Sequence, residues 1–221
     1  MQPAGLRERK KQQTRQLIAD TAAALFGERG YEQVAVRDVA KVANVSEQTV
    51  YNYFPTKERL VLDREQELLD RLPLLIRSRA PGSSPAAALR GDALALVDAI
   101  RSLPRDQARG GLGYLAAVSP TVRRLCLEMT DRLADAMADA LMESTPGLSA
   151  QLAKLQAVSL AWIFQTVTDE MGRRELAGHG FSQIAAELKP IVEDLIDCLD
   201  HQVDHRQTGD SFRASSTGCC N

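Results

Sequence analysis

Several kinds of segment are missing from this 221-residue chain. No apolar run reaches the ~18 residues of a membrane span, and long runs of β-branched residues are absent. The N-terminus is basic but has no apolar stretch behind it, which argues against a secretory signal. We therefore expect a cytoplasmic protein with no membrane partner, and the abundance of Ala and Leu favours an all-α fold.

Sequence signatures of enzymes, metal sites and cofactor sites are also missing. The four cysteines lack the spacing of a metal site; they are Cys126, Cys198, Cys219 and Cys220. His201 and His205 share a helix face, but no third metal ligand accompanies them. The glycines at 110, 111 and 113 follow no strand and lack the lysine of a phosphate-binding loop, so they suggest close helix approach or a distorted pocket wall. We expect no enzyme activity, no metal and no cofactor.

Residues 36–57 predict two short helices joined by a tight turn. The first helix has an apolar face with helical spacing, made by Val36, Val39, Ala40 and Ala43. Asn44 tolerates the left-handed conformation of a helix end, and Ser46 can cap the second helix. The second helix places Val50 and Phe54 on one face and leaves its other faces free. This spacing is typical of a helix–turn–helix whose second helix enters a DNA major groove.

A wider set of residues agrees with one known family in type and spacing: Phe26, Gly30, Tyr31, residues 36–40, Val45, Ser46 and residues 49–58. On these, residues 10–62 resemble the DNA-binding domain of the TetR family of bacterial repressors. The resemblance implies an N-terminal three-helix helix–turn–helix domain over residues 1–55 and a C-terminal helical bundle over residues 56–205, which binds a ligand and dimerises. The composition of residues 206–221 predicts a disordered tail.

By position in the family motif, the candidate DNA contacts are Arg37, Ser46, Gln48, Thr49, Tyr51, Asn52, Tyr53 and Lys57. Gln48 and Asn52 can pair with adenine edges, whereas Arg37 can reach a guanine or a phosphate. The charge distribution agrees with a nucleic-acid partner for this end. Residues 1–60 carry ten Lys/Arg against seven Asp/Glu, a balance of +3, whereas the remainder carries 17 against 22, a balance of −5.

The spacing of apolar and helix-breaking residues predicts the remaining elements. We expect a first helix over 9–28 after a flexible arm, and a fourth helix that Thr56 caps and Pro73 kinks or ends. A weakened helix is expected over 106–118, because of its glycines. The other predicted helices cover residues 86–103, 120–143, 148–176 and 181–204.

The resemblance places the dimer interface on the last two helices. The candidates for it are Leu155, Phe181, Ile184, Leu188, Ile191 and Leu195. The apolar stripe of the final helix is wide, so it can equally face the chain's own core. Helix bundles commonly enclose apolar pockets with a few polar anchors. The candidate ligand-binding residues are Leu96, Ile100, Tyr114, Met129, Trp162, Gln165 and Asp169.

Residues 52–58, 63–65, 79–85 and 87–90 also resemble an actinobacterial TetR subgroup with an acyl-CoA-like ligand-binding domain. The resemblance implies a homodimeric, ligand-responsive repressor in the bacterial cytoplasm, associated with the nucleoid. Its partners would be a palindromic double-stranded DNA operator, a second copy of itself and a small hydrophobic effector. The alternatives are an activator, a ligand-independent regulator, or a helical protein-interaction module that does not bind DNA.

Overall fold

The computed structural model describes residues 5–103 and 108–213, and of residues 201–213 it describes the backbone alone. The described residues are helical and contain no strand, as the composition predicts. The elements in chain order are α1 (Leu6–Arg29), α2 (Val36–Val42), α3 (Glu47–Tyr53), α4 (Lys57–Val61), α5 (Glu65–Arg77), α6 (Pro85–Arg101), η1 (Ala108–Gly110), α7 (Leu112–Val118), α8 (Pro120–Ser144), α9 (Ala150–Leu176) and α10 (Phe181–Arg213).

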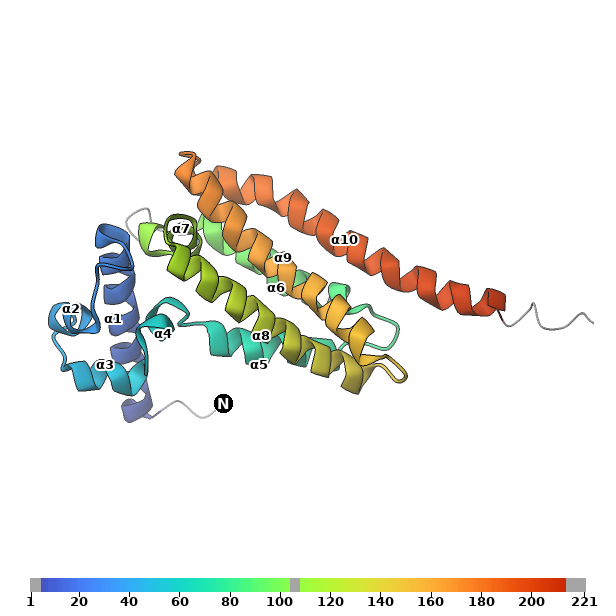
Figure 1. Ribbon diagram of the computed structural model, residues 1–221, viewed down its shortest axis with the longest axis horizontal. Helices are drawn as coiled ribbons and strands as arrows, with labels where there is room; N and C mark the ends of the chain where they lie inside the picture. The colour runs from blue at the N-terminus through green and yellow to red at the C-terminus, as the bar shows by residue number, and fades with distance from the viewer. Residues whose placement is uncertain (1–4, 104–107, 214–221) are drawn as a thin grey trace, which may run out of the picture.

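The helices form two parts, which we call the head and the body (Figure 1). The head comprises α1 to α4, with the short helices α2 and α3 beside the long α1. The body comprises the long helices α5, α6, α8, α9 and α10, together with α7 at the end nearest the head. None of the helices in the described part of the chain is long and apolar enough to cross a membrane.

Several helix boundaries agree with the sequence pattern, and in the structure a serine caps the start of each of these helices. Ser119 accepts a hydrogen bond from the backbone of Val122, and Pro120 follows at the first position of α8. Ser84 caps α6 in the same way, and Ser149 caps α9. The predicted boundaries of these three helices are therefore correct to within two residues.

The expected fourth helix is divided differently. The helix is interrupted between Val61 and Glu65, where α4 ends and α5 begins. Pro73 lies buried inside α5 and does not end it. A proline inside a helix removes only one backbone donor, and burying its ring in the core compensates part of that loss. Thr56 makes no capping hydrogen bond, because its side chain bonds Glu58 instead. The prediction that Pro73 could end this helix and that Thr56 caps it is wrong.

Both ends of the chain are more helical than predicted. The first helix begins at Leu6, so residues 6–8 of the expected flexible arm are helical, and residues 1–4 lie outside the described residues. The last helix continues to Arg213, through part of the tail expected to be disordered. Polar residues can extend a helix, because few breakers interrupt the sequence there. Residues 214–221, which include Cys219 and Cys220, lie outside the described residues.

Two apolar cores hold the molecule together. The larger core lies in the body and is built from α5, α6, α8, α9 and α10. The smaller core holds the head, but it also includes residues of the body, namely Leu115, Ala116, Val122, Leu125 and Cys126. The head therefore packs directly on α7 and on the first turns of α8. This contact fixes the head against the body through apolar burial.

Glycines allow two of these helix contacts to be unusually close. A Cβ added at Gly110 would lie 2.2 Å from the carbonyl oxygen of Ala23 on α1. A Cβ added at Gly172 would lie 2.0 Å from the carbonyl oxygen of Gly113, where α7 crosses α9. Both distances are far below van der Waals contact. The glycines at 110 and 113 therefore serve close helix approach, one of the two roles predicted for them.

Candidate nucleic-acid interface

The turn between α2 and α3 has the hydrogen bonds of a Schellman motif. Asn44 has φ of 55°, and it is the one residue other than glycine with a positive φ in the described ranges. Its N–H donates to the carbonyl of Lys41 at 3.4 Å, and the N–H of Val45 donates to the carbonyl of Ala40 at 3.0 Å. The predicted left-handed turn at Asn44 is confirmed. The turn fixes the direction in which α3 leaves α2.

Ser46 caps α3 as predicted. Its Oγ accepts a hydrogen bond from the backbone N–H of Thr49 at 3.1 Å. The hydroxyls of Ser46 and Thr49 also lie 2.8 Å apart and share a hydrogen bond. Two of the predicted DNA contacts are thus tied to the start of α3, and Ser46 has a structural role that needs no DNA.

The third helix has one buried face and one free face. Val50 and Phe54 are buried in the head core, as their spacing predicts. On the other side Gln48, Tyr51 and Asn52 are exposed. Gln48 Nε2 donates to Asn52 Oδ1 at 3.1 Å, so the two predicted adenine-reading amides lie together. Both can exchange this bond for bonds to base edges, because they face outward.

The last two predicted DNA contacts also hold the head together. Lys57 Nζ donates to the carbonyl of Tyr31 at 2.6 Å and lies 4.1 Å from the centroid of the Tyr31 ring. Burial lowers the pKa of Lys57. Tyr53 is half-buried and packs against the head core. Arg37, by contrast, is exposed on α2. Replacing Lys57 would therefore disturb the head as well as any phosphate contact.

Three polar contacts that sequence reasoning missed connect the head to neighbouring elements. Arg15 on α1 donates to the carbonyl of Asp63 at 2.8 Å, and its guanidinium lies 4.8 Å from the ring centroid of Phe54. Ser119 at the start of α8 donates to Glu32, which lowers the pKa of that carboxyl. Glu65 at the start of α5 bonds arginines from α4 and α8. Apart from Arg59 and Glu65, the partners are far apart in the sequence, so no local pattern signals their contacts.

The residues predicted to bind a ligand do not line one pocket. Leu96 and Ile100 pack in the body core, whereas Tyr114 and Met129 pack against the head core. Trp162 is 47% exposed on the outer side of α9. The position of Trp162 on α9 turns its apolar surface outward.

Gln165 and Asp169 belong to a hydrogen-bond network between α8 and α9. Thr130 donates to the buried Gln165 at 2.8 Å, and Gln165 donates to Asp169 at 2.9 Å. Arg123 also donates to Asp169 at 2.9 Å. Near this network, burial and the carboxylate of Asp169 raise the pKa of Cys126 to about 12, so its thiol stays protonated. The network satisfies its own members, which is what a buried polar group needs for stability.

The residues predicted for the dimer interface divide between the core and the surface. Ile184 and Leu188 are fully buried in the body core, so they have no side-chain surface to offer a second copy. Phe181, Ile191 and Leu195 are partly buried against the same core. Leu155, in contrast, is 61% exposed on α9. The wide stripe of α10 faces its own core, the alternative that the sequence left open.

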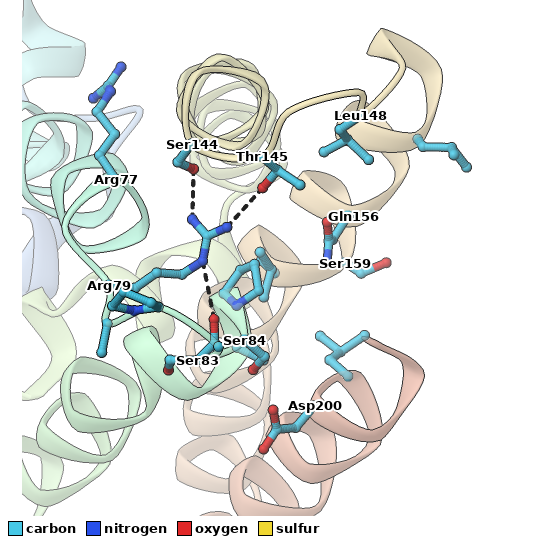
Figure 2. A pocket seen from close by; sticks show the side chains of 18 of the residues that line it. Arg77, Arg79, Ser83, Ser84, Ser144, Thr145, Leu148, Gln156, Ser159 and Asp200 are labelled. Atoms are coloured by element: carbon cyan, nitrogen blue, oxygen red, sulfur yellow. Dashed lines mark hydrogen bonds between the residues drawn. The ribbon is translucent and has the colours of Figure 1, made fainter. Parts of the chain in front are cut away.

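A groove of about 570 Å³ lies between the C-terminal ends of α5 and α8 and the first turns of α6 and α9, at the end of the body away from the head (Figure 1), and Figure 2 shows its lining. Its apolar wall is formed by Leu148, Leu152, Leu155, Leu160 and Leu199. Arg79 lies beside it and donates to Ser144 Oγ at 2.6 Å and to Thr145 Oγ1 at 2.8 Å. Burial lowers the pKa of Arg79. In the described part of the chain no group of three or more His, Cys, Asp or Glu residues could hold a metal.

Known proteins agree with this arrangement. Residues 18–63 match the family model described as "Bacterial regulatory proteins, tetR family". The chain is 28% identical over 193 residues to the HTH-type transcriptional repressor KstR of Rhodococcus jostii, a match that covers 84% of each protein. It is 31% identical over 114 residues to the HTH-type transcriptional regulator YuxN of Bacillus subtilis, covering 49% of this chain and 39% of that protein.

Other relatives match in part, and solved structures support the fold. The match spans 58% of TcmR from Streptomyces glaucescens and 63% of AcrR from Shigella flexneri. A TetR-family regulator from Streptomyces coelicolor superimposes with a TM-score of 0.50 and 18% identity, covering 89% of this chain and 99% of that one. At this identity the structural likeness shows the fold alone.

The fold and the exposed α3 give the head the form of a helix–turn–helix DNA-binding domain. The relatives of the chain are named as regulators, not as enzymes. Residues 18–63 match the model of the TetR family, and the relatives that match beyond these residues are named as transcriptional regulators.

Proposed function

We propose that the protein is a ligand-responsive repressor that binds a palindromic DNA operator as a homodimer. A small hydrophobic effector, acyl-CoA-like in the sequence-based hypothesis, would release it from the operator. This function would place the protein in the bacterial cytoplasm, at the nucleoid. Residues 1–55 would read DNA and residues 56–205 would bind the effector and the second copy.

The observation that carries the proposal is the free face of α3. Gln48, Tyr51 and Asn52 project from a short helix that the head core holds rigidly from behind. Amide side chains pair with adenine edges in the major groove, which is wide enough for one helix. One head offers few base contacts. Two heads about 34–36 Å apart would read two half-sites of a palindrome.

The outer face of α9 supports the homodimer. Leu152, Leu155, Val158 and Trp162 are all exposed, and their spacing puts them on one face of the helix. We call these four residues the α9 stripe. A contiguous apolar patch on a protein surface commonly marks an interaction site. A second copy that presents its own α9 stripe would bury both, as a two-fold interface requires.

The groove of Figure 2 supports an effector with an apolar part. Leu148, Leu160 and Leu199 would contact a hydrocarbon chain, whereas Leu152 and Leu155 lie where the groove meets the α9 stripe. The guanidinium of Arg79, which bonds only neutral oxygens in the described residues, would attract an anionic end. Such an effector shifts the DNA-binding equilibrium only by its differential affinity for the two states of the protein.

Selection of genomic DNA fragments by the purified protein at physiological salt tests this function. We expect one palindromic site, released by long-chain acyl-CoA. A site that stays bound in its presence would keep the regulator and discard this effector. If no fragment is enriched, the protein-interaction module becomes the better hypothesis.

Variants of α3 then test whether this helix contacts the selected DNA site. The double variant Gln48→Ala, Asn52→Ala should bind the selected site more weakly, by about 1–3 kcal/mol for each pairing with a base that it removes. Its stability should hardly change, because an exposed pair at this spacing contributes about 0.2–0.5 kcal/mol. Gln66→Ala, which removes a similar exposed bond to Asp70 on α5, is the matched control. Equal affinities of the two variants would contradict the assignment.

A further inference from the structure

The first turns of α1 carry four cations that have no partner among the described residues. Residues 7–15 hold one acid, Glu8, against five cations: Arg7, Arg9, Lys10, Lys11 and Arg15. Residues 7–11 are exposed, and the side chains of their four cations form no salt bridge or hydrogen bond within the described ranges. Most other arginines of the described body are ion-paired, such as Arg77, Arg90 and Arg123.

Three of these cations continue the packing face of α1. At about 100° per residue, Arg7, Lys11 and Arg15 lie on the same side of the helix as Ile18. Ile18 is fully buried in the head core, and Arg15 contacts the ring of Phe54. The face of α1 that packs against the other helices of the head thus changes from apolar to cationic toward the N-terminus. Nothing in the described structure covers the cationic part.

The same face lies close to the recognition helix. Phe54 directly follows α3, so Arg15 marks the point where α1 passes the C-terminal end of α3. Arg7 lies eight residues earlier, which is about 12 Å along a helix. The major groove is about 12 Å wide and is bordered by phosphates. Figure 1 shows the first turns of α1 extending past α3.

We propose that the first turns of α1 bind the DNA phosphates that border the groove occupied by α3. Arg7 and Lys11 are the principal contacts, and Lys10 lies next to them. The inference rests on the proposed function, because it places a second DNA contact beside the first. Duplex DNA fits better than a membrane surface, because residues 7–16 include no apolar side chain and a membrane-bound helix needs an apolar face.

Phosphate contacts have a characteristic salt dependence. Each contact releases counterions, so the logarithm of the binding constant falls with the logarithm of salt concentration by about 0.9 per contact. The double variant Arg7→Gln, Lys11→Gln should therefore lower this slope by about 1.8 and weaken binding roughly tenfold at physiological salt. Glutamine keeps the helix propensity of the replaced residues, so α1 should remain folded.

The matched control removes two exposed cations from the body. Arg101 ends α6 and Lys189 lies on α10, and neither side chain has an ion-pair partner among the described residues. Arg101→Gln, Lys189→Gln causes the same change in net charge. We would measure fluorescence anisotropy of a labelled duplex with the selected site over a salt series, for the wild type and both variants. The slope should fall for Arg7→Gln, Lys11→Gln alone.

The outcomes separate the inference from the function on which it rests. If the wild type binds the duplex and both double variants keep its slope, the inference is overturned and the proposed function stands. If Arg7→Gln, Lys11→Gln binds the duplex like the wild type but loses binding to vesicles containing anionic lipid, the partner is a membrane and the inference is again overturned. If the wild type binds no duplex at any salt concentration, the proposed function fails and the inference fails with it.

Discussion

Arg132 on α8 donates from Nε to the carboxylate of Glu65 at 2.7 Å, at the edge of the body that adjoins the head. Arg59 on α4 donates to the other oxygen of the same carboxylate. Glu65 is only 1% exposed, whereas both arginines are close to half exposed. The helical backbone is interrupted between α4 and α5, immediately before Glu65. The carboxylate of Glu65 therefore connects α4 of the head to α8 of the body, at the point where the backbone between α4 and α5 is not helical.

Glu65→Gln should destabilise the protein by about 1–3 kcal/mol. The amide keeps the shape of the side chain but removes the charge that attracts both guanidiniums, and it has one accepting oxygen where the carboxylate has two. The two arginines remain partly solvated, which keeps the loss below that of a fully buried ion pair. Urea unfolding at neutral pH, followed by circular dichroism, measures the change.

Glu67→Gln is the control for Glu65→Gln. Glu67 lies on the same helix and pairs with Arg64, but both side chains are more than half exposed. An exposed pair of this kind contributes about 0–1 kcal/mol. If the two variants lost the same stability, Glu65 would have no special role at the boundary between head and body.

Gly172→Ala should destabilise the protein by about 1–3 kcal/mol or prevent α7 from packing on α9. The new Cβ would lie 2.0 Å from the carbonyl oxygen of Gly113 and 3.0 Å from the Cβ of Ala117. The first contact is with backbone, which cannot rotate away, so the helices must separate. Thermal unfolding measures the loss.

Gly91→Ala is the opposite case and serves as the control. Gly91 is exposed inside α6, and a Cβ there would meet nothing within 4 Å. Alanine should stabilise this helix by up to about 1 kcal/mol, through helix propensity alone. A destabilising effect at both positions would contradict the steric explanation for Gly172.

The local structure of the head could be predicted because each feature depends on neighbouring residues. Asn44 bends the turn and Ser46 caps α3, both within a few residues of the groups they bond. Val50 and Phe54 are buried as their spacing predicts. The outward face of α3 follows from the same periodicity.

Contacts between distant segments could not be predicted. The bond from Arg132 to Glu65 joins residues 67 positions apart, and apolar periodicity carries no information about it. Apolar spacing also cannot tell a core-facing residue from one that meets a second copy. Leu188 and Leu155 both suited the interface by type, yet Leu188 is fully buried and Leu155 is exposed.

Tyr31 should make stability depend on alkaline pH. Burial raises the pKa of Tyr31 to about 12, and the carboxylates of Glu58 and Glu32 act in the same direction. Because the folded value exceeds the unfolded value of about 10, folding favours the protonated phenol. This contribution is complete below about pH 10 and is lost as the pH rises toward about 12, by up to about 1.4 kcal/mol per pH unit.

Tyr31→Phe isolates this effect, because phenylalanine keeps the ring and does not ionise. The difference in unfolding free energy between wild type and variant should be constant near neutral pH. It should change in favour of the variant as the pH rises above about 10. Urea unfolding of both proteins over this range tests it. A difference independent of pH would mean that the phenol titrates equally in the folded and unfolded protein.

Trp162 allows the proposed dimer to be followed directly, because it is the only tryptophan in the chain. It lies on the α9 stripe with Leu155, and association should exclude water from its indole. Its emission should therefore move to shorter wavelength as protein concentration rises. Leu155→Glu should weaken association at least about tenfold, since burying a leucine contributes about 1.5–3 kcal/mol and the charge adds a desolvation penalty.

Leu74→Glu provides the comparison for Leu155→Glu, since Leu74 is 58% exposed but lies on α5, away from the α9 stripe. Light scattering should give a dimer for Leu74→Glu and a monomer for Leu155→Glu at the same concentration. Both variants should keep the helical content of the wild type, because each replaces a side chain outside the core. If the wild type is a dimer and Leu155→Glu remains one, with tryptophan emission independent of concentration, the two copies must meet through a surface other than the α9 stripe.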